Sequence, residues 1–313
     1  MKSVAAERLI APLALGAALC LVGAAAHAQG APQGATRQGK LLLTSGVSTI
    51  DGAAGGGLTP WAVTGSYATA GEIGGTAFLT GVKTQDYSLA TSGVAVGITD
   101  RVELSLARQD FDTKNNLAPL GLPGLKLKQD ILGVKVRVAG DAVLDSDTLM
   151  PQIAVGLQYK KADAGALGPT LYGPLGARDS GTDVYVSATK LFLAQGVLVN
   201  GTLRATKANQ NGLLGFGSAR SDSYKLQPEI SLANLLSKNV AVGFEVRAKP
   251  DNLNRSVLGT GALAEDDWFD VFVAWAPTKN LSLTAAYVDL GKIAPALQPK
   301  RQTGAYLSAQ LAF

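Results

Sequence analysis

The sequence predicts an all-β protein, a transmembrane antiparallel up-and-down β-barrel of about fourteen strands, with twelve as the lower count, preceded by a signal peptide. Three observations predict this class. The N-terminus has the layout of a secretory leader, the rest of the chain alternates apolar and polar residues, and the connections are short and long in turn. After the leader no run of about 18 apolar residues occurs, so we expect no spanning helix.

Composition excludes two other classes. Hydrophobic residues make up 47% of the 313 residues and charged residues 17%, which is too apolar for a disordered chain. The formal net charge is +4, an excess too small to form the basic surface of a nucleic-acid-binding protein. We therefore expect a folded protein with no nucleic-acid partner.

The leader begins with Lys2 and Arg8, continues with an apolar stretch over 9–26, and ends at Ala26-His27-Ala28, a small-x-small cleavage site. The predicted domains are a signal peptide over 1–28, a short segment over 29–39 and an outer-membrane barrel over 40–313. Cleavage would remove Cys20 and His27, which are the one cysteine and the one histidine. Without histidine the chain lacks the commonest general base, so we expect no enzyme.

Alternation with a period of two predicts the strands. In one example Leu132, Val134 and Val136 alternate with Gly133 and Lys135, which gives the strand one apolar and one polar face. Most such segments have the length of a tilted membrane-crossing strand. The fourteen segments are 40–49, 60–69, 72–83, 87–98, 101–109, 127–139, 150–160, 182–193, 196–207, 223–234, 239–249, 267–276, 280–290 and 303–313.

Connection lengths support a barrel with both termini in the periplasm. Short connections are expected near 70–71, 99–100, 195, 237–238 and 277–279, and long ones at 110–126, 161–181, 208–222, 250–266 and 291–302. Outer-membrane barrels pair tight periplasmic turns with long outer loops. Because the first expected strand begins at residue 40, we expect no separate N-terminal plug, and any obstruction must come from loops.

Three hairpins specify an expected register. We pair Ile98 with Val102, Trp275 with Leu281, and Val242 with Leu232. The third pairing places Glu229 opposite Glu245. Each register keeps apolar residues opposite apolar residues, and a slip by one residue would move a whole strand's apolar set to the other face.

The apolar face could pack into the core of a secreted β-sandwich or meet lipid, and two features favour lipid. Aromatic residues on this face gather near strand ends, as they do at membrane interfaces. The last strand ends with Leu307, Leu311 and Phe313 on one face, which resembles the signal read by the barrel-assembly machinery of the outer membrane. Lys190 is the exception on the apolar face, and either snorkelling or a bulge would explain it.

The polar face carries charges at mid-strand, which we expect to line a lumen. These residues are Glu103, Lys135, Arg137, Arg204, Glu229, Glu245 and Arg247. Both signs are present, so a mutually neutralised ladder is favoured over acid–base chemistry.

Apolar residues in the long loops are expected to cap the mouth or to catch an apolar solute. The residues concerned are Leu120, Leu122, Leu213, Leu214 and Phe216. The acidic run 265–267 is interpreted as a solvated rim, and we expect no metal and no cofactor.

Three stretches, 40–61, 184–216 and 249–254, resemble an uncharacterised family of Gram-negative envelope proteins that carries a "domain of unknown function" label. The resemblance covers nearly all of the mature chain. It implies the outer membrane as the location, with lipid and lipopolysaccharide as surroundings, and it implies no activity or site residue.

Together these observations predict a porin-like barrel that gives small polar solutes passive passage through a charged lumen. Two alternatives stay open: uptake of hydrophobic molecules by way of the apolar loops, and a closed structural barrel.

Overall fold

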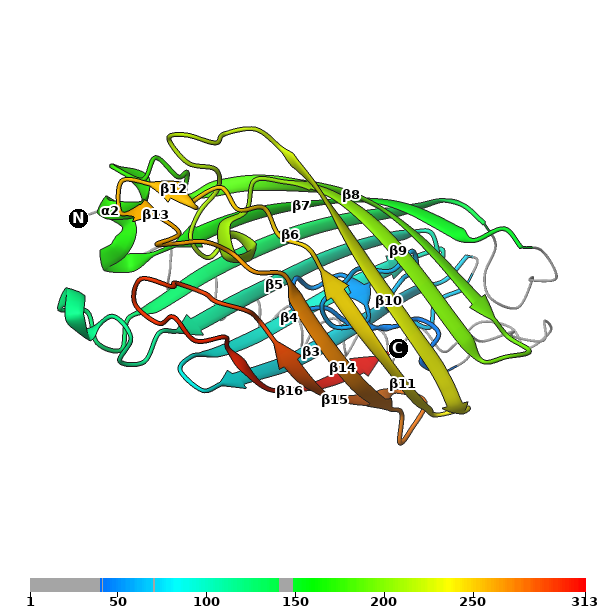
Figure 1. The fold of residues 1–313 in the computed structure, drawn as a ribbon. Helices are drawn as coiled ribbons and strands as arrows, with labels where there is room; N and C mark the ends of the chain where they lie inside the picture. Colours follow the sequence, from blue (N-terminus) through cyan, green and yellow to red (C-terminus); the bar gives the residue numbers. More distant parts are fainter. Residues whose placement is uncertain (1–39, 41, 70, 141–148) are drawn as a thin grey trace, which may run out of the picture.

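The computed structural model describes residues 40, 42–69, 71–140 and 149–313. The expected signal peptide 1–28 and the segment 29–39 lie outside these residues. The chain forms a closed barrel in which strands that follow one another in the wall are antiparallel neighbours (Figure 1). The last strand, β16 (Thr303–Ala312), pairs with the first wall strand, β3 (Ile73–Thr84), and this pairing closes the ring.

Twelve strands make up the wall. Between β3 and β16 they are β4 (Ser88–Ile98), β5 (Val102–Asp112), β6 (Lys126–Ala139), β7 (Gln152–Asp163), β8 (Ser180–Phe192), β9 (Val197–Thr206), β10 (Lys225–Ser237), β11 (Val240–Arg247), β14 (Trp268–Trp275) and β15 (Leu281–Asp289). The short elements outside the wall are β1 (Val47–Ser48), β2 (Ala54–Gly55), β12 (Arg255–Ser256), β13 (Gly259–Thr260), η1 (Ala118–Leu120), η3 (Gly165–Leu167), α2 (Gly168–Tyr172) and η4 (Asn209–Gly212). No helix among the described residues is both long and apolar enough to span a membrane.

The predicted fold class is confirmed, with the lower strand count. Each of the twelve wall strands coincides with one expected segment to within three residues at either end. The expected strands over 40–49 and 60–69 are wrong. This part of the chain turns sharply at Gly46, Gly52 and Gly57, whose φ values of 71°, 90° and 135° suit glycine, and it holds only the two-residue strands β1 and β2.

The wall has the two faces that the alternation predicts. Side chains of one parity point outward and are about half exposed, for example Leu106 at 53% and Val271 at 50%, whereas their neighbours in sequence point into the barrel. The outward set is apolar along most of the wall and would contact lipid acyl chains. Lys190 also faces outward, two residues before the end of β8, and the pairing of β8 with β9 continues through it without a bulge.

One expected register is confirmed and two are shifted. Ile98 does pair with Val102. Trp275 pairs with Leu283, and Val242 pairs with Asn234, so each partner lies two residues from the expected one. A shift of two keeps every side chain on its face, which is why the face pattern alone could not detect it.

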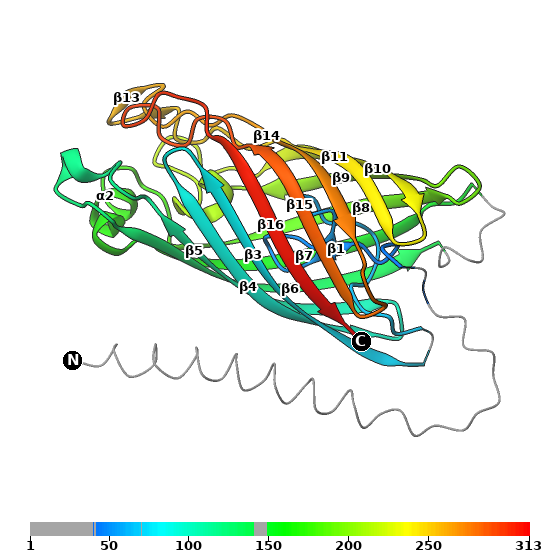
Figure 2. The same ribbon diagram turned by 90° about the horizontal axis from the view of Figure 1, so that it is seen from below.

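The two ends of the barrel differ. Tight connections and the C-terminus lie at one end, where the carbonyl of Phe313 accepts a hydrogen bond from the amide of Gly75. The longer loops lie at the other end (Figure 2). The wall is uneven in height, because β6 has 14 residues whereas β11 and β14 have eight each.

Candidate functional site

Residues 42–69, which we call the lumen segment, lie inside the barrel (Figures 1 and 2). Every residue of the segment is buried except Leu42, Tyr67 and Thr69, which are partly exposed. The expectation that no N-terminal segment obstructs the barrel is therefore wrong. A barrel of this strand number encloses more space than the inward side chains fill, and the lumen segment occupies the remainder.

The first attachment of the lumen segment is a buried ion pair on the wall. Glu103 lies 3.0 Å from Lys135, and both side chains are at most 2% exposed. The Glu103 carboxylate accepts hydrogen bonds from the amides of Ala54 (3.0 Å) and Gly65 (2.8 Å), and Lys135 donates to the Ala54 carbonyl (3.0 Å). The two wall charges thus neutralise each other, and both also form hydrogen bonds with backbone groups of the lumen segment.

The second attachment is Glu245. Its carboxylate accepts from the amides of Leu58 (2.7 Å) and Thr59 (3.3 Å), and from the hydroxyls of Thr59 (2.5 Å) and Ser231 (2.6 Å). The close approach requires glycine at residue 56, because a Cβ there would lie 2.2 Å from the Glu245 carboxylate. The backbone is therefore shaped to fit this one carboxylate.

The third attachment, which we call the charge ring, is a closed circuit of six alternating charges. Five consecutive wall strands, β7 to β11, give one charge each, and the lumen segment gives the sixth. In order the members are Lys160, Asp183, Arg204, Glu229, Arg247 and Asp51, and the distances between successive members, ending with Asp51 to Lys160, are 3.1, 3.5, 2.5, 3.6, 2.8 and 3.4 Å. No member is more than 4% exposed, so each charge depends on its neighbours in the ring.

A long loop closes the lumen at the end of the barrel opposite the tight turns. The connection between β9 and β10 enters the barrel at η4, where Gln210 and Asn211 have left-handed φ values of 45° and 61°. Asn211 donates to Asp51 (2.7 Å), so the loop and the lumen segment meet at the charge ring. Gln210 is held by Glu265, which accepts from its amide (2.8 Å), and by Lys249, which donates to its side chain (2.7 Å).

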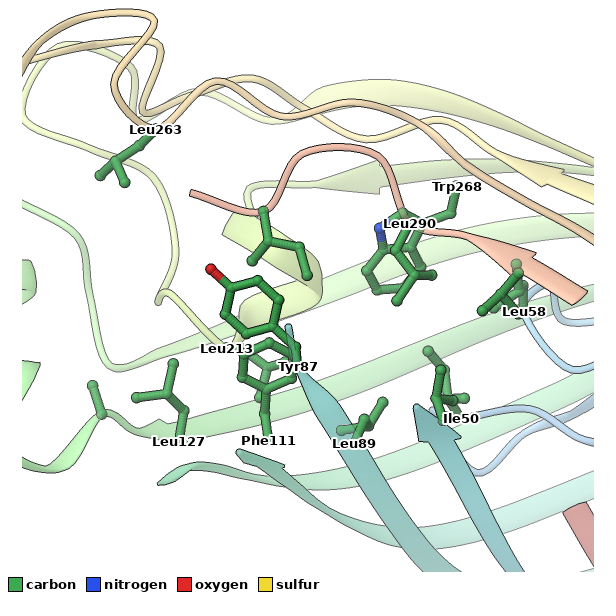
Figure 3. Packing of buried hydrophobic residues seen from close by; sticks show 14 of the residues in the cluster. Ile50, Leu58, Tyr87, Leu89, Phe111, Leu127, Leu213, Leu263, Trp268 and Leu290 are labelled. Carbon is green, nitrogen blue, oxygen red and sulfur yellow. The ribbon is translucent and has the colours of Figure 1, made fainter. Parts of the chain in front are cut away.

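Beneath the long loops an apolar cluster, which we call the roof, fills the mouth (Figure 3). It joins Ile50 and Leu58 of the lumen segment to wall residues such as Phe111 and Leu127 and to Leu213 of the β9–β10 loop. The described residues thus form three layers: the apolar roof, the charged middle, and a second apolar cluster around Trp61 and Phe272 near the tight turns.

The family of the chain can now be stated. A family model described as a protein of unknown function, DUF3034, matches residues 44–310. The chain belongs to this family. The match includes nearly all of the lumen segment and all of the charge ring, and it confirms the resemblance to an uncharacterised family.

Solved structures similar to this chain include two porins and an outer membrane channel. A NanC porin structure has a TM-score of 0.48 and 6% identity over 77% of this chain and 100% of that chain. The COG4313 outer membrane channel from Pseudomonas putida F1 has a TM-score of 0.48 and 10% identity over 79% and 97%. A KdgM porin in complex with disordered oligogalacturonate has a TM-score of 0.46 and 8% identity over 76% and 99%. No curated protein matches the chain.

The seven charged residues that the sequence singles out all belong to the inner side of the barrel. Six of them take part in the three attachments, and Arg137 lies near the tight turns, where it pairs with Asp100 at 3.1 Å. The expected contact between Glu229 and Glu245 is wrong, because the register places Glu229 opposite Arg247 and Ser231 opposite Glu245. The inward charges therefore neutralise one another more completely than in the expected register, which would place two carboxylates opposite each other.

The apolar loop residues divide into two groups. Leu213 is buried in the roof, Leu214 packs against the roof, and Phe216 is buried but is not one of the roof residues. Leu120 is 54% exposed and Leu122 is partly exposed, so these two do not belong to the roof.

Three members of the charge ring were not singled out from the sequence. Lys160 and Asp183 have the inward parity of their strands but lie at or near the ends of the expected segments, where the mid-strand criterion did not include them. Asp51 has no signal of this kind, because the segment around it has no strand period. Glu265 is buried, so its interpretation as a solvated rim residue is wrong.

Glu265 makes the attachment of η4 sensitive to pH. Burial raises the pKa of its carboxyl to about 7, although the charge of Lys249 acts in the opposite direction. A carboxyl whose pKa is raised by folding contributes fully below its ordinary pKa of 4.5, and that contribution is lost as the pH rises to about 7. We expect the free energy of unfolding in urea to fall over this window, and Glu265→Gln to remove this part of the fall. If the free energy of unfolding fell equally with pH in the wild-type protein and in Glu265→Gln, this role of Glu265 would be contradicted. Asp222→Asn, which changes an exposed ion pair, is the matched control.

Proposed function

We propose that this protein is a gated outer-membrane channel for small polar solutes, in which the lumen segment is the gate. One observation carries the proposal: the buried charges of the inner wall hold a segment that belongs to no wall strand. The barrel closes through the pairing of β16 with β3, so the wall is complete without residues 42–69. A segment of this kind can leave without opening the barrel.

Departure of the segment would expose a polar lining with charges of both signs. Among the described wall strands the inward basic residues are Lys135, Arg137, Lys160, Arg204 and Arg247, and the inward acidic residues are Glu103, Asp183, Glu229, Glu245 and Asp270. A balanced lining favours water and small polar solutes and gives a weak overall preference between anions and cations.

Uptake of a hydrophobic molecule is the second candidate, and the roof favours it because apolar side chains meet there beneath the loops. The charge ring argues against it, since an apolar solute on the axis would have to cross a layer of buried ions. Changing Leu213, Leu214 and Phe216 together to serine separates the two candidates. The channel proposal expects polar flux to be kept, and the uptake proposal expects slower entry of an apolar solute.

A reversible lock tests the gate. The hydroxyls of Thr59 in the lumen segment and Ser231 in β10 are in direct contact, so Thr59→Cys with Ser231→Cys places two thiols at disulfide distance. In planar bilayers we expect the oxidised double variant to be silent and the reduced form to show stepwise conductance, with Thr59→Cys alone as the control. Equal conductance in both forms would reject the gate, and silence even after removal of the segment would reject the channel.

Delivery to the outer membrane forms part of the proposal. We propose that the leader is cleaved after Ala28, and that the last strand is read by the barrel-assembly machinery through Leu307, Leu311 and Phe313. In support, Leu307 and Leu311 face outward on β16, 63% and 45% exposed. N-terminal sequencing of the mature protein tests the cleavage, and assembly of a Phe313→Ala variant tests the signal.

A further inference from the structure

We propose that the wall site that holds Asp51 is a binding site for the carboxylate of a small organic acid, and that this acid competes with Asp51 and thereby releases the gate. The inference rests on the proposed gated channel and adds the chemical class of a solute to it. Asp51 is then a built-in substitute for the carboxylate of the solute.

Four donors from four separate elements converge on the Asp51 carboxylate. Arg247 of β11 donates through Nη1 at 2.8 Å, and Asn211 of η4 donates through Nδ2 at 2.7 Å. Gln109 of β5 donates through Nε2 at 3.3 Å, and the Nζ of Lys160 on β7 lies at 3.4 Å. All four side chains come from the wall or from the outer loop, so the site remains when the lumen segment leaves.

The charge balance of the ring calls for one anion. Without Asp51 the wall keeps three basic members, Lys160, Arg204 and Arg247, against the two acidic members Asp183 and Glu229. One positive charge is then unpaired, and it lies between Lys160 and Arg247, the two ends of the arc. A single carboxylate restores neutrality, whereas a neutral solute leaves a buried cation unpaired and a cation is repelled.

Arg204, which lies across the ring from Asp51, holds a further donor. The Nη2 atom of Arg204 is buried, and it has no hydrogen-bond partner among the described residues. A carboxylate larger than that of an aspartate side chain, or one carrying a hydroxyl, could accept from it. This donor gives a free acid a contact that Asp51 does not make.

Competition for the same donors links binding to gating. A solute that binds the wall only when Asp51 has left stabilises the open arrangement by its differential affinity for the two states. The acid is therefore expected to raise the open fraction as well as to occupy the site.

Chemical rescue tests the site. Asp51→Ala removes the carboxylate and leaves room for acetate. The reporter is Ser48→Cys in the lumen segment, a position that is 3% exposed, and its maleimide labelling rate measures displacement of the segment. We expect Asp51→Ala to raise the rate at least roughly tenfold, because a buried cation loses its partner. About 0.1 M acetate should lower this raised labelling rate roughly twofold, as expected for a site whose Kd for acetate is about 0.1 M, and acetamide at the same concentration should leave the rate unchanged.

Two variants complete the design. Adding Arg247→Gln to Asp51→Ala should abolish the acetate effect, and Asp222→Ala, which breaks an exposed ion pair, should show no acetate effect. Equal responses to acetate and acetamide, or rescue that survives Arg247→Gln, would overturn the inference. Rescue in a protein that never conducts would reject the channel and keep the carboxylate site, whereas conductance without rescue would keep the channel and reject the site.

Discussion

Deletion of residues 42–69 is expected to convert a channel that opens only a small part of the time into a permanently open pore. The deletion removes the Asp51 carboxylate and all the backbone groups that Glu103 and Glu245 hold, while the pairing of β16 with β3 stays intact. We expect the mean current in planar bilayers to rise at least about tenfold over the full-length protein, because the polar lining then hydrates. The measurement is stepwise conductance of refolded protein.

The matched control shortens an exposed loop at the opposite end. Residues 256–260 span the β12–β13 hairpin, where Val257 and Leu258 are 62% and 54% exposed. Their deletion should leave the conductance unchanged. Far-UV circular dichroism should show the same β content for both variants, and a silent bilayer with a correctly folded 42–69 deletion would reject the channel.

Arg247→Met is expected to be the most disruptive single substitution for the gate. The Arg247 guanidinium binds Asp51, the Leu58 carbonyl (3.1 Å) and Asn211 (2.8 Å), and it also borders Glu229. Its removal leaves two basic ring members against three acidic ones, so one buried negative charge is uncompensated, which costs about 3–5 kcal/mol. The wall strands keep their own hydrogen bonds, so the loss should appear as release of the lumen segment.

The labelling rate of Ser48→Cys measures this release, and an increase of at least about a hundredfold is expected from a loss of that size. Arg178→Met is the matched control, since Arg178 is 64% exposed and lies in a surface ion pair. An unchanged labelling rate in Arg247→Met, or a rate that rises equally in Arg178→Met, would contradict the role of the charge ring.

The wall could be predicted from the sequence because it separates two media. Each strand must present one face to lipid and the other to the lumen, so its side chains alternate, and all twelve wall strands carry this pattern. The lumen segment meets protein on every side. Its burial therefore has no period, and the alternation found over 40–49 and 60–69 had no structural meaning.

Half of the charge ring was predictable in membership, and its pairing was not. Parity placed Arg204, Glu229 and Arg247 on the inner face, and all three are there. The face pattern stays the same when the register shifts by two residues. The pattern therefore allows Glu229 to lie opposite Glu245, whereas the structure places Glu229 opposite Arg247. Asp51 depends on the path of an irregular chain, which the local sequence does not specify.

Amide hydrogen exchange of the protein in lipid tests most directly whether the lumen is filled. The amides of Ala54, Leu58 and Gly65 donate to the buried carboxylates of Glu103 and Glu245. They should exchange as slowly as the amides of a wall strand such as β5, and Arg247→Met should make them fast while β5 stays protected. Exchange of these three amides at the rate of an unstructured chain in the full-length protein would contradict the account.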